Sequence, residues 1–178
     1  MSYYEAKYIG PDLAALFDQT PAHRAAQRMA STGGDRLHAA IAENTPVRTG
    51  NLRTSWYREP TVPESHGSAT AYVSRVRTDV DYAPYVNYGT GLFGPKHAKY
   101  LIEPHPPKRF LSWIDPATRR RVFYRQVWHP GSPGAHMIQY GAGLVEGLAN
   151  EILLGDLEVF KREMEAQAIQ AQGRVSVR

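Results

Sequence analysis

The chain changes character at residues 45–55, which read Thr45-Pro46-Val47-Arg48-Thr49-Gly50-Asn51-Leu52-Arg53-Thr54-Ser55. Proline disfavours helical backbone at the residue before it, so Pro46 predicts that a helix ends at Thr45. Gly50 is best explained as a backbone position that needs dihedral angles most residues avoid. The stretch therefore predicts a turn between a helical N-terminal segment and a strand-forming segment.

Residues 22–44 have the pattern of a long amphipathic helix. They are rich in Ala, Arg and Gln, with a sparse apolar stripe made by Met29, Leu37 and Ile41. Thr20 is a suitable N-cap, and Pro21 stands at the favoured first helical position. The pair Gly33-Gly34 is predicted to kink or split the helix.

The strongest strand prediction covers residues 69–78, which are rich in β-branched and aromatic side chains. Residues 52–58 are short and only partly alternating, and residues 60–68 are predicted to be the loop that enters the strand. After the strand, Asp81 is predicted to cap a single helical turn that Gly89 ends.

Residues 92–127 form a predicted insertion. Its first part, residues 92–108, holds four prolines, three lysines and two histidines, a composition typical of an exposed loop. A hairpin is predicted next, in which residues 110–114 and 122–128 flank a turn at 115–119. In this hairpin, Trp113 and Trp128 are expected to face each other.

A C-terminal helix is predicted over residues 135–154 from the apolar stripe Ile138, Ala142, Val145, Ala149 and Ile152. Gly155 is predicted to interrupt it, and Asp156 to restart a helix that runs to about residue 172. At the other end, Pro11 opens a short helical pattern that includes Leu13, Leu16 and Phe17. The last six residues are expected to be loose.

These elements predict an α+β fold. A small antiparallel sheet is packed by a long N-terminal helix and a C-terminal helix, with an extra β-hairpin insertion. Because no Pro/Gly linker joins two separate cores, a single domain over residues 1–178 is predicted. Its core spans about residues 21–154, with residues 1–20 and 155–178 as peripheral arms.

The composition is that of a globular protein without disulfides. The 178 residues are 42% hydrophobic and 21% charged, cysteine is absent, and the net charge is +4. No apolar run is long enough to predict a membrane span, and the first residues lack a signal-peptide core.

No set of residues predicts catalysis or a cofactor. The seven histidines include no pair at i,i+4 spacing that would predict a helical zinc site. His105, His129 and His136 are the strongest metal candidates, and their simpler interpretation is surface or turn packing. No nucleophile, base and orienting residue occur together in a known pattern, so neither a catalytic residue nor a metal site is predicted.

One hairpin is strongly basic. Its cationic residues offer a contact with DNA phosphates or with an acidic subunit, and the alternative is a solvated hairpin tip. These candidate contact residues are Lys108, Arg109, Arg119, Arg120, Arg121 and Arg125.

Three motifs in order resemble a known family. After the 45–55 stretch come Tyr82-Ala83-Pro84-Tyr85-Val86-Asn87-Tyr88-Gly89-Thr90-Gly91 and then His129-Pro130-Gly131. Together the motifs resemble the HK97 gp10-like proteins, which are neck and tail-completion proteins of tailed bacteriophages. The matching turn residues are Pro46, Thr49, Gly50, Leu52, Tyr82, Tyr85, Gly89, Thr90, His129, Pro130 and Gly131. Asn87 departs from the family pattern, in which glutamate is usual.

The resemblance implies a structural virion protein of the head–tail junction of a long-tailed phage. Such a protein completes the tail end as a homo-oligomeric ring, with six copies favoured and twelve as the alternative. It implies connector or head-closure and tail-terminator proteins as partners, DNA passing nearby without sequence readout, no membrane and no cofactor. It also implies assembly in the host cytoplasm and a final place in the virion. Tail terminator or head-closure protein, a sequence-independent DNA-binding module and a histidine-based metal hydrolase are the alternatives.

Overall fold

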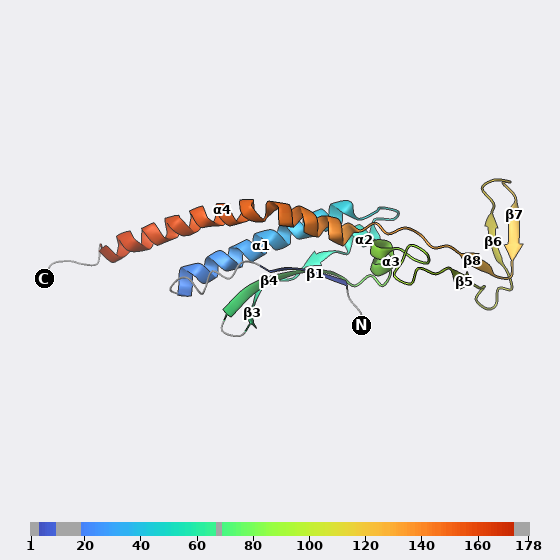
Figure 1. Cartoon of the computed structure of the whole chain (residues 1–178), viewed down its shortest axis with the longest axis horizontal. Coiled ribbons are helices and arrows are strands. Elements are labelled where there is room, and N and C mark those ends of the chain that lie inside the picture. Colours follow the sequence, from blue (N-terminus) through green and yellow to red (C-terminus); the bar gives the residue numbers. More distant parts are fainter. Residues whose placement is uncertain (1–3, 10–18, 67–68, 173–178) are drawn as a thin grey trace. The chain divides into compact units, whose positions relative to one another are not determined.

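The computed structural model describes residues 4–9, 19–66 and 69–172, and its elements are α-helices and antiparallel strands (Figure 1). The helical pattern predicted from Pro11 and the last six residues lie outside this range. The predicted α+β fold with a long N-terminal helix, a C-terminal helix and small antiparallel sheets is confirmed. In chain order the elements are β1 (Tyr4–Ile9), α1 (Gln19–Asn44), α2 (Asn51–Thr54), β2 (Tyr57–Arg58), β3 (Val62–His66), β4 (Ala69–Thr78), α3 (Ala83–Tyr88), β5 (Tyr100–Ile102), β6 (Leu111–Ile114), β7 (Arg121–Tyr124), β8 (Val127–His129) and α4 (Met137–Gln172).

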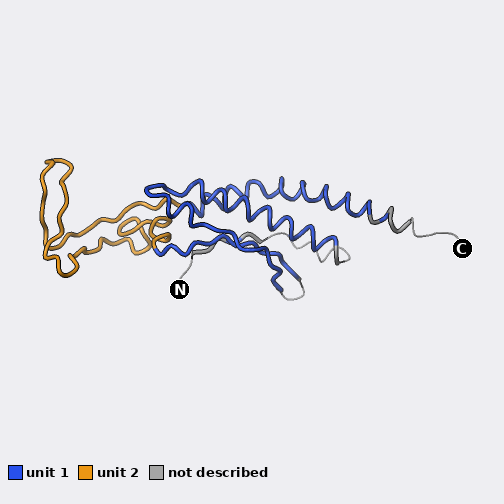
Figure 2. The backbone as a smooth tube through the Cα atoms, turned by 180° about the vertical axis from the view of Figure 1, so that it is seen from behind, with its two compact units in different colours: residues 1–81, 137–178 blue, residues 82–136 orange. Residues whose placement is uncertain are grey.

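The chain divides into two compact units (Figure 2). Unit 1 comprises residues 1–81 and 137–178, and unit 2 comprises residues 82–136. Unit 2 begins with the second motif and contains the predicted insertion. The single domain predicted from the sequence stays a prediction.

Strand β4 is the centre of the sheet in unit 1. Its bounds are those predicted, and it pairs antiparallel with β1 along one edge and with β2 and β3 along the other. The predicted entry loop at 60–68 was wrong, because Val62 to His66 forms β3 and pairs with β4 from Val73 to Ala69. Residues 51–54 form one turn of helix, so only Tyr57 and Arg58 of the 52–58 segment are strand.

Helix α1 packs against β4 at Gly34. A Cβ on Gly34 would overlap the side chain of Ser74, which is fully buried in β4. The helix is continuous from Gln19 to Asn44, so the predicted kink at Gly33-Gly34 was wrong. Because Gly34 has no side chain, β4 can approach α1 closely at this position. The glycine does not bend the helix.

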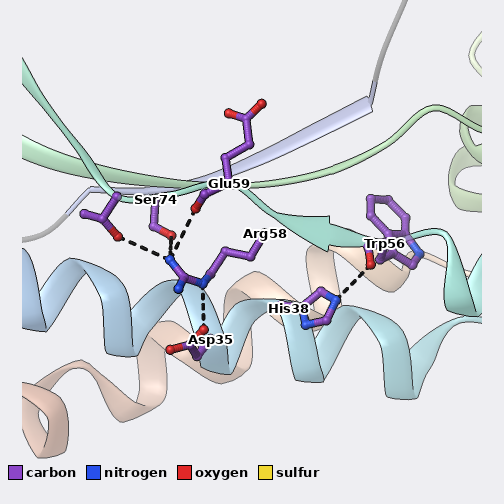
Figure 3. Close-up of polar contacts among 7 residues, drawn as sticks. Asp35, His38, Trp56, Arg58, Glu59 and Ser74 are labelled. Carbon is purple, nitrogen blue, oxygen red and sulfur yellow. Dashed lines mark hydrogen bonds and ion pairs between the residues drawn. The ribbon is translucent and has the colours of Figure 1, made fainter.

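Arg58 ties the same strand layer to α1 (Figure 3). Its Nε lies 2.6 Å from Oδ1 of Asp35 on the helix, and its Nη1 donates to Oγ of Ser74 at 3.3 Å. Close by, the His38 ring contacts the backbone oxygen of Trp56 at 3.0 Å between Nε2 and O. The side chains of Arg58 and His38 are therefore both paired where α1 meets the strands.

Helix α4 runs unbroken from Met137 to Gln172 and packs along α1. The predicted interruption at Gly155 was wrong. Beyond that glycine, Asp156 and Glu163 both pair with Arg28 of α1, at 3.4 and 2.9 Å, which favours continued helix. The core between the helices and sheet is built from small and medium apolar side chains, among them Ala25, Met29, Ala30, Ile41, Val73, Val76, Met137 and Val145.

Unit 2 consists of a short helix and two separate two-stranded ladders. Helix α3 begins after Tyr82, which makes no side-chain capping bond, so the predicted Asp81 cap was wrong; Gly89 ends the helix as predicted. Strand β5 lies inside the segment predicted as loop and pairs with β8, while β6 pairs with β7. Trp128 therefore lies opposite Leu101, and the predicted Trp113–Trp128 pair was wrong.

No helix in the described ranges is both long enough and apolar enough to cross a membrane.

Candidate interaction surface

The first motif of unit 1 is organised around the buried side chain of Thr45. Its hydroxyl donates to the backbone oxygen of Ile41 at 2.7 Å and accepts from Nε1 of Trp56 at 3.1 Å. Arg53 donates through Nη2 to the backbone oxygen of Thr45 at 3.0 Å. These bonds satisfy the end of α1 and fix where the chain turns towards the sheet.

The predicted turn residues of this motif divide by burial. Leu52 is 5% exposed and packs inward, whereas Pro46 and Thr49 are exposed. Gly50 has φ 85°, in the left-handed region, and a Cβ there would meet nothing within 4 Å. Gly50 is therefore required by its backbone angle and not by crowding.

The second and third motifs, about forty residues apart in the sequence, meet within unit 2. Thr90 N donates to the Ser132 oxygen at 2.9 Å, Ser132 N donates to Oγ1 of Thr90 at 3.0 Å, and Leu92 N donates to the Pro130 oxygen at 2.7 Å. Gly89 and Pro133 form an isolated antiparallel bridge. The two motifs thus close one loop junction.

Glycine is needed on both sides of this junction. Gly89 has φ 81° and Gly131 has φ 95°, and a Cβ on Gly131 would overlap the Thr90 oxygen. His129 accepts a bond from Gly131 N at its Nδ1, 3.0 Å away, while its ring lies 5.3 Å from that of Tyr100. The third motif is accordingly built for close backbone approach.

A pocket of about 710 Å³ opens beside this junction within unit 2. The glycine-rich backbone of residues 89–91, the rings of Tyr85 and Tyr100, and Lys96 and Lys99 line it. Tyr85 is 63% exposed. Aromatic walls with two lysines suit an apolar group that has acidic neighbours.

The β6–β7 hairpin exposes apolar side chains on both of its faces. On one face, Trp113 stacks on Tyr124 with ring centroids 5.0 Å apart. On the other, Ile114 is 59% and Phe123 is 62% exposed. The predicted cationic residues are all exposed: Arg119 and Arg120 lie in the turn, Arg121 begins β7, and Lys108, Arg109 and Arg125 lie in the flanking segments.

The hairpin turn is held by Asp115. One carboxylate oxygen accepts from Ala117 N at 3.0 Å and the other from the Thr118 hydroxyl at 2.9 Å. These bonds, that of the Ala117 N–H first, lower the pKa of Asp115 below its ordinary value. Arg119 completes the turn in the left-handed region, with φ 57°.

The histidine candidates are not brought into a ligand set. Among the residues that the structure describes, no three His, Asp or Glu side chains lie close enough together to share a metal ion. His105 is exposed in the loop before β6, and His136 follows the loop junction with φ 51°.

A second stripe on α4 was missed by the sequence analysis. Large apolar side chains point away from the core at Tyr140, Leu144 and Leu154, which are 63%, 53% and 64% exposed. They share a face with Gly147, Glu151 and Glu158, because all six positions follow an alternating spacing of four and three residues. That spacing is present in the sequence, but the helix was predicted only from the apolar stripe that faces inward.

Residues 12–89 match the family model described as “Bacteriophage HK97-gp10, putative tail-component”. Over these residues the chain is similar to the HK97 gp10-like family. The match confirms the resemblance seen in the sequence and ends at Gly89, so the HK97 gp10-like segment includes α1, β4 and α3. The third motif and the 92–127 segment lie beyond it. No curated protein and no solved structure matches the chain.

The HK97 gp10-like family is that of a bacteriophage tail component. A tail component of this kind has its place in the virion. The β6–β7 hairpin and the outward face of α4 lie outside the matched segment.

Proposed function

We propose that the protein is a structural component of the head–tail junction, or neck, of a long-tailed bacteriophage. It completes the tail end and joins it to the connector and tail-terminator rings, and it is not an enzyme. The observation that carries this proposal is the HK97 gp10-like match over residues 12–89.

The exposed side chains of unit 2 support a role in assembly. Among residues 82–136, all of which the structure describes, the buried positions are Ala83, Asn87, Gly89 and Gly94. Large aromatic side chains and arginines lie outside instead, and these are the residue types enriched at protein interfaces. Such a unit is suited to binding neighbouring proteins.

In this proposal the copies of the protein form a homo-oligomeric ring, and both units take part in the assembly. Six copies match a sixfold tail, and twelve copies, matching a portal, are the alternative. The ring assembles in the host cytoplasm and stays in the virion, with head-closure or connector proteins on one side and the terminator on the other. Genomic DNA passes nearby and is not read by sequence.

The test is to produce phage in which translation of this protein is stopped by an amber codon. We expect DNA-filled heads and complete tails that remain unjoined under the electron microscope, with joining restored when purified protein is added. Joined, infectious particles that lack the protein would contradict the neck role. Failure to build any tail would favour an earlier, different tail function.

The alternative supported by a specific observation is a sequence-independent DNA-binding module. Exposed arginines crowd the β6–β7 hairpin, and phosphate contacts of this kind give salt-sensitive binding. Replacing Arg119, Arg120 and Arg121 with alanine should then lower the salt dependence of duplex binding. No duplex binding at low salt would remove this alternative.

A further inference from the structure

The outward stripe of α4 is an apolar surface with acidic members. Tyr140, Leu144 and Leu154 are each more than half exposed. Gly147 lies on the same face, and a Cβ there would meet nothing within 4 Å. Glu151 and Glu158 lie on the same face, and Glu158 is 76% exposed. The helix as a whole has six acidic against two basic side chains, a net charge of −4.

The β6–β7 hairpin has the opposite character. Ile114 and Phe123 project from one face beside Arg121, whose register partner is Ile114. A two-stranded hairpin with apolar groups on both faces has little stability by itself. Unit 2 carries eight Lys and Arg against two Asp and Glu, a net charge of +6.

We propose that the hairpin of one copy docks on the outward α4 stripe of a second copy. The inference rests on the proposed ring and names the two surfaces that build it. Ile114 and Phe123 cover Tyr140, Leu144 and Leu154, while Arg120 and Arg121 face Glu151 and Glu158. A contact between two different surfaces is head-to-tail, and repeated by a rotation it closes a ring.

Charge selects this pairing over its competitors. Pairing two α4 stripes would bring Glu151 and Glu158 of each copy into one seam, where like charges oppose association. Duplex DNA suits the hairpin but is repelled by the acidic stripe, so it leaves the stripe uncovered. Opposite net charges on hairpin and helix favour the copy-to-copy contact, and such attraction weakens as salt increases.

Two double variants test the pairing in the full-length chain. I114D/F123D disables the hairpin, and L144D/L154D disables the stripe. V47D, at a residue 57% exposed in the 46–49 turn of unit 1, is the matched control. Sedimentation velocity in low salt should show wild type and V47D as oligomers larger than dimers. Each double variant alone should associate about 100-fold more weakly.

Mixing the two double variants separates head-to-tail contact from other arrangements. The mixture has one intact hairpin and one intact stripe, so we expect 1:1 dimers that do not grow. Growth beyond dimers, or no association in the mixture, would overturn the proposal. If the stripe variant lost association while the hairpin variant kept it, the result would point to stripe-to-stripe pairing and would overturn the proposal as well.

A charge exchange within one chain supplies the second test. R120E/R121E should abolish oligomers, and adding E151K/E158K to the same chain should restore them. Absence of rescue would overturn the pairing of charges. Oligomers that persist in every variant would refute these surfaces while leaving the ring intact. A wild type that stays monomeric at about 100 µM would refute the contact, whereas the neck role is judged separately by the amber phage.

Discussion

At the scale of single residues, Gly34 sets how closely α1 approaches β4. An alanine Cβ would overlap the Ser74 hydroxyl and lie 2.6 Å from its Cβ. Because Ser74 is buried and bonded to Arg58, Gly34→Ala should lower the free energy of unfolding by about 1–3 kcal/mol, despite alanine's higher helix propensity. Urea unfolding followed by circular dichroism measures the change.

Gly143→Ala in α4 is the matched control for that substitution. A Cβ at Gly143 would meet nothing within 4 Å. We therefore expect a gain of about 0.5–1 kcal/mol from the lower entropy of the unfolded chain. The same sign of change in both variants would refute the close approach at Gly34.

Thr45 tests the hydrogen bonding of the first motif. Thr45→Val keeps the shape of the side chain but leaves Nε1 of the buried Trp56 without its acceptor. The expected cost is about 1–3 kcal/mol in the free energy of unfolding. Thr49→Val, at an exposed position, should change it by less than about 0.5 kcal/mol. If Thr45→Val changed the free energy of unfolding as little as Thr49→Val, the Thr45 hydroxyl would be dispensable for stability.

At the scale of elements, the β6–β7 turn should respond to acid through Asp115. The pKa of this carboxyl is lowered in the fold, so its bonds stabilise the turn above the ordinary carboxyl pKa and are lost as pH falls through the folded value. The transition is expected below about pH 4. Amide NMR shifts of Ala117 and Thr118 should move there, and Asp115→Asn should make them flat. Movement centred above pH 4 would contradict the lowered pKa.

An element can be predicted from the sequence when its own residues favour it, and not when distant contacts stabilise it. Strand β4 was predicted with correct bounds because its own β-branched and aromatic residues favour a strand. Strand β3 contains Pro63 and Glu64 and has no such pattern. It is a strand because it pairs with β4, and because Glu64 forms ion pairs with Lys7 and Arg75.

The same distinction applies to α4 and to the candidate surface. Gly155 suggests a break by local rules, but the ion pairs from Arg28 to Asp156 and Glu163 lie beyond it. Glycine readily adopts a positive φ, so the positive φ angles of Gly89 and Gly131 could be expected from the sequence. The hydrogen bonds that join the two motifs, by contrast, link residues about forty positions apart. Contacts of that range leave no mark in the local pattern.

At the scale of the whole molecule, the two units differ in what they bury. Unit 1 encloses Met29, Ile41, Val73, Val76 and Met137, each less than 2% exposed. In unit 2, which the structure describes completely, the largest fully buried side chain is that of Asn87. Since burial of apolar surface is the main source of stability, unit 2 should be the less stable of the two.

Hydrogen exchange of the free and the assembled chain tests this difference. In the free chain, amides of β6, β7 and β8 should exchange at least about 100-fold faster than those of β4 and the middle of α1, because opening unit 2 exposes little apolar surface. Assembly should slow exchange in β6 and β7, since a partner that binds only the folded state stabilises it. The outward face of α4 cannot report by amide exchange alone, because its amides are already bonded within the helix, so the hairpin is the informative element.

Equal protection of both units in the free chain would show that unit 2 has a source of stability that its burial does not account for. Protection that does not change on assembly would place the copy-to-copy contact away from the hairpin.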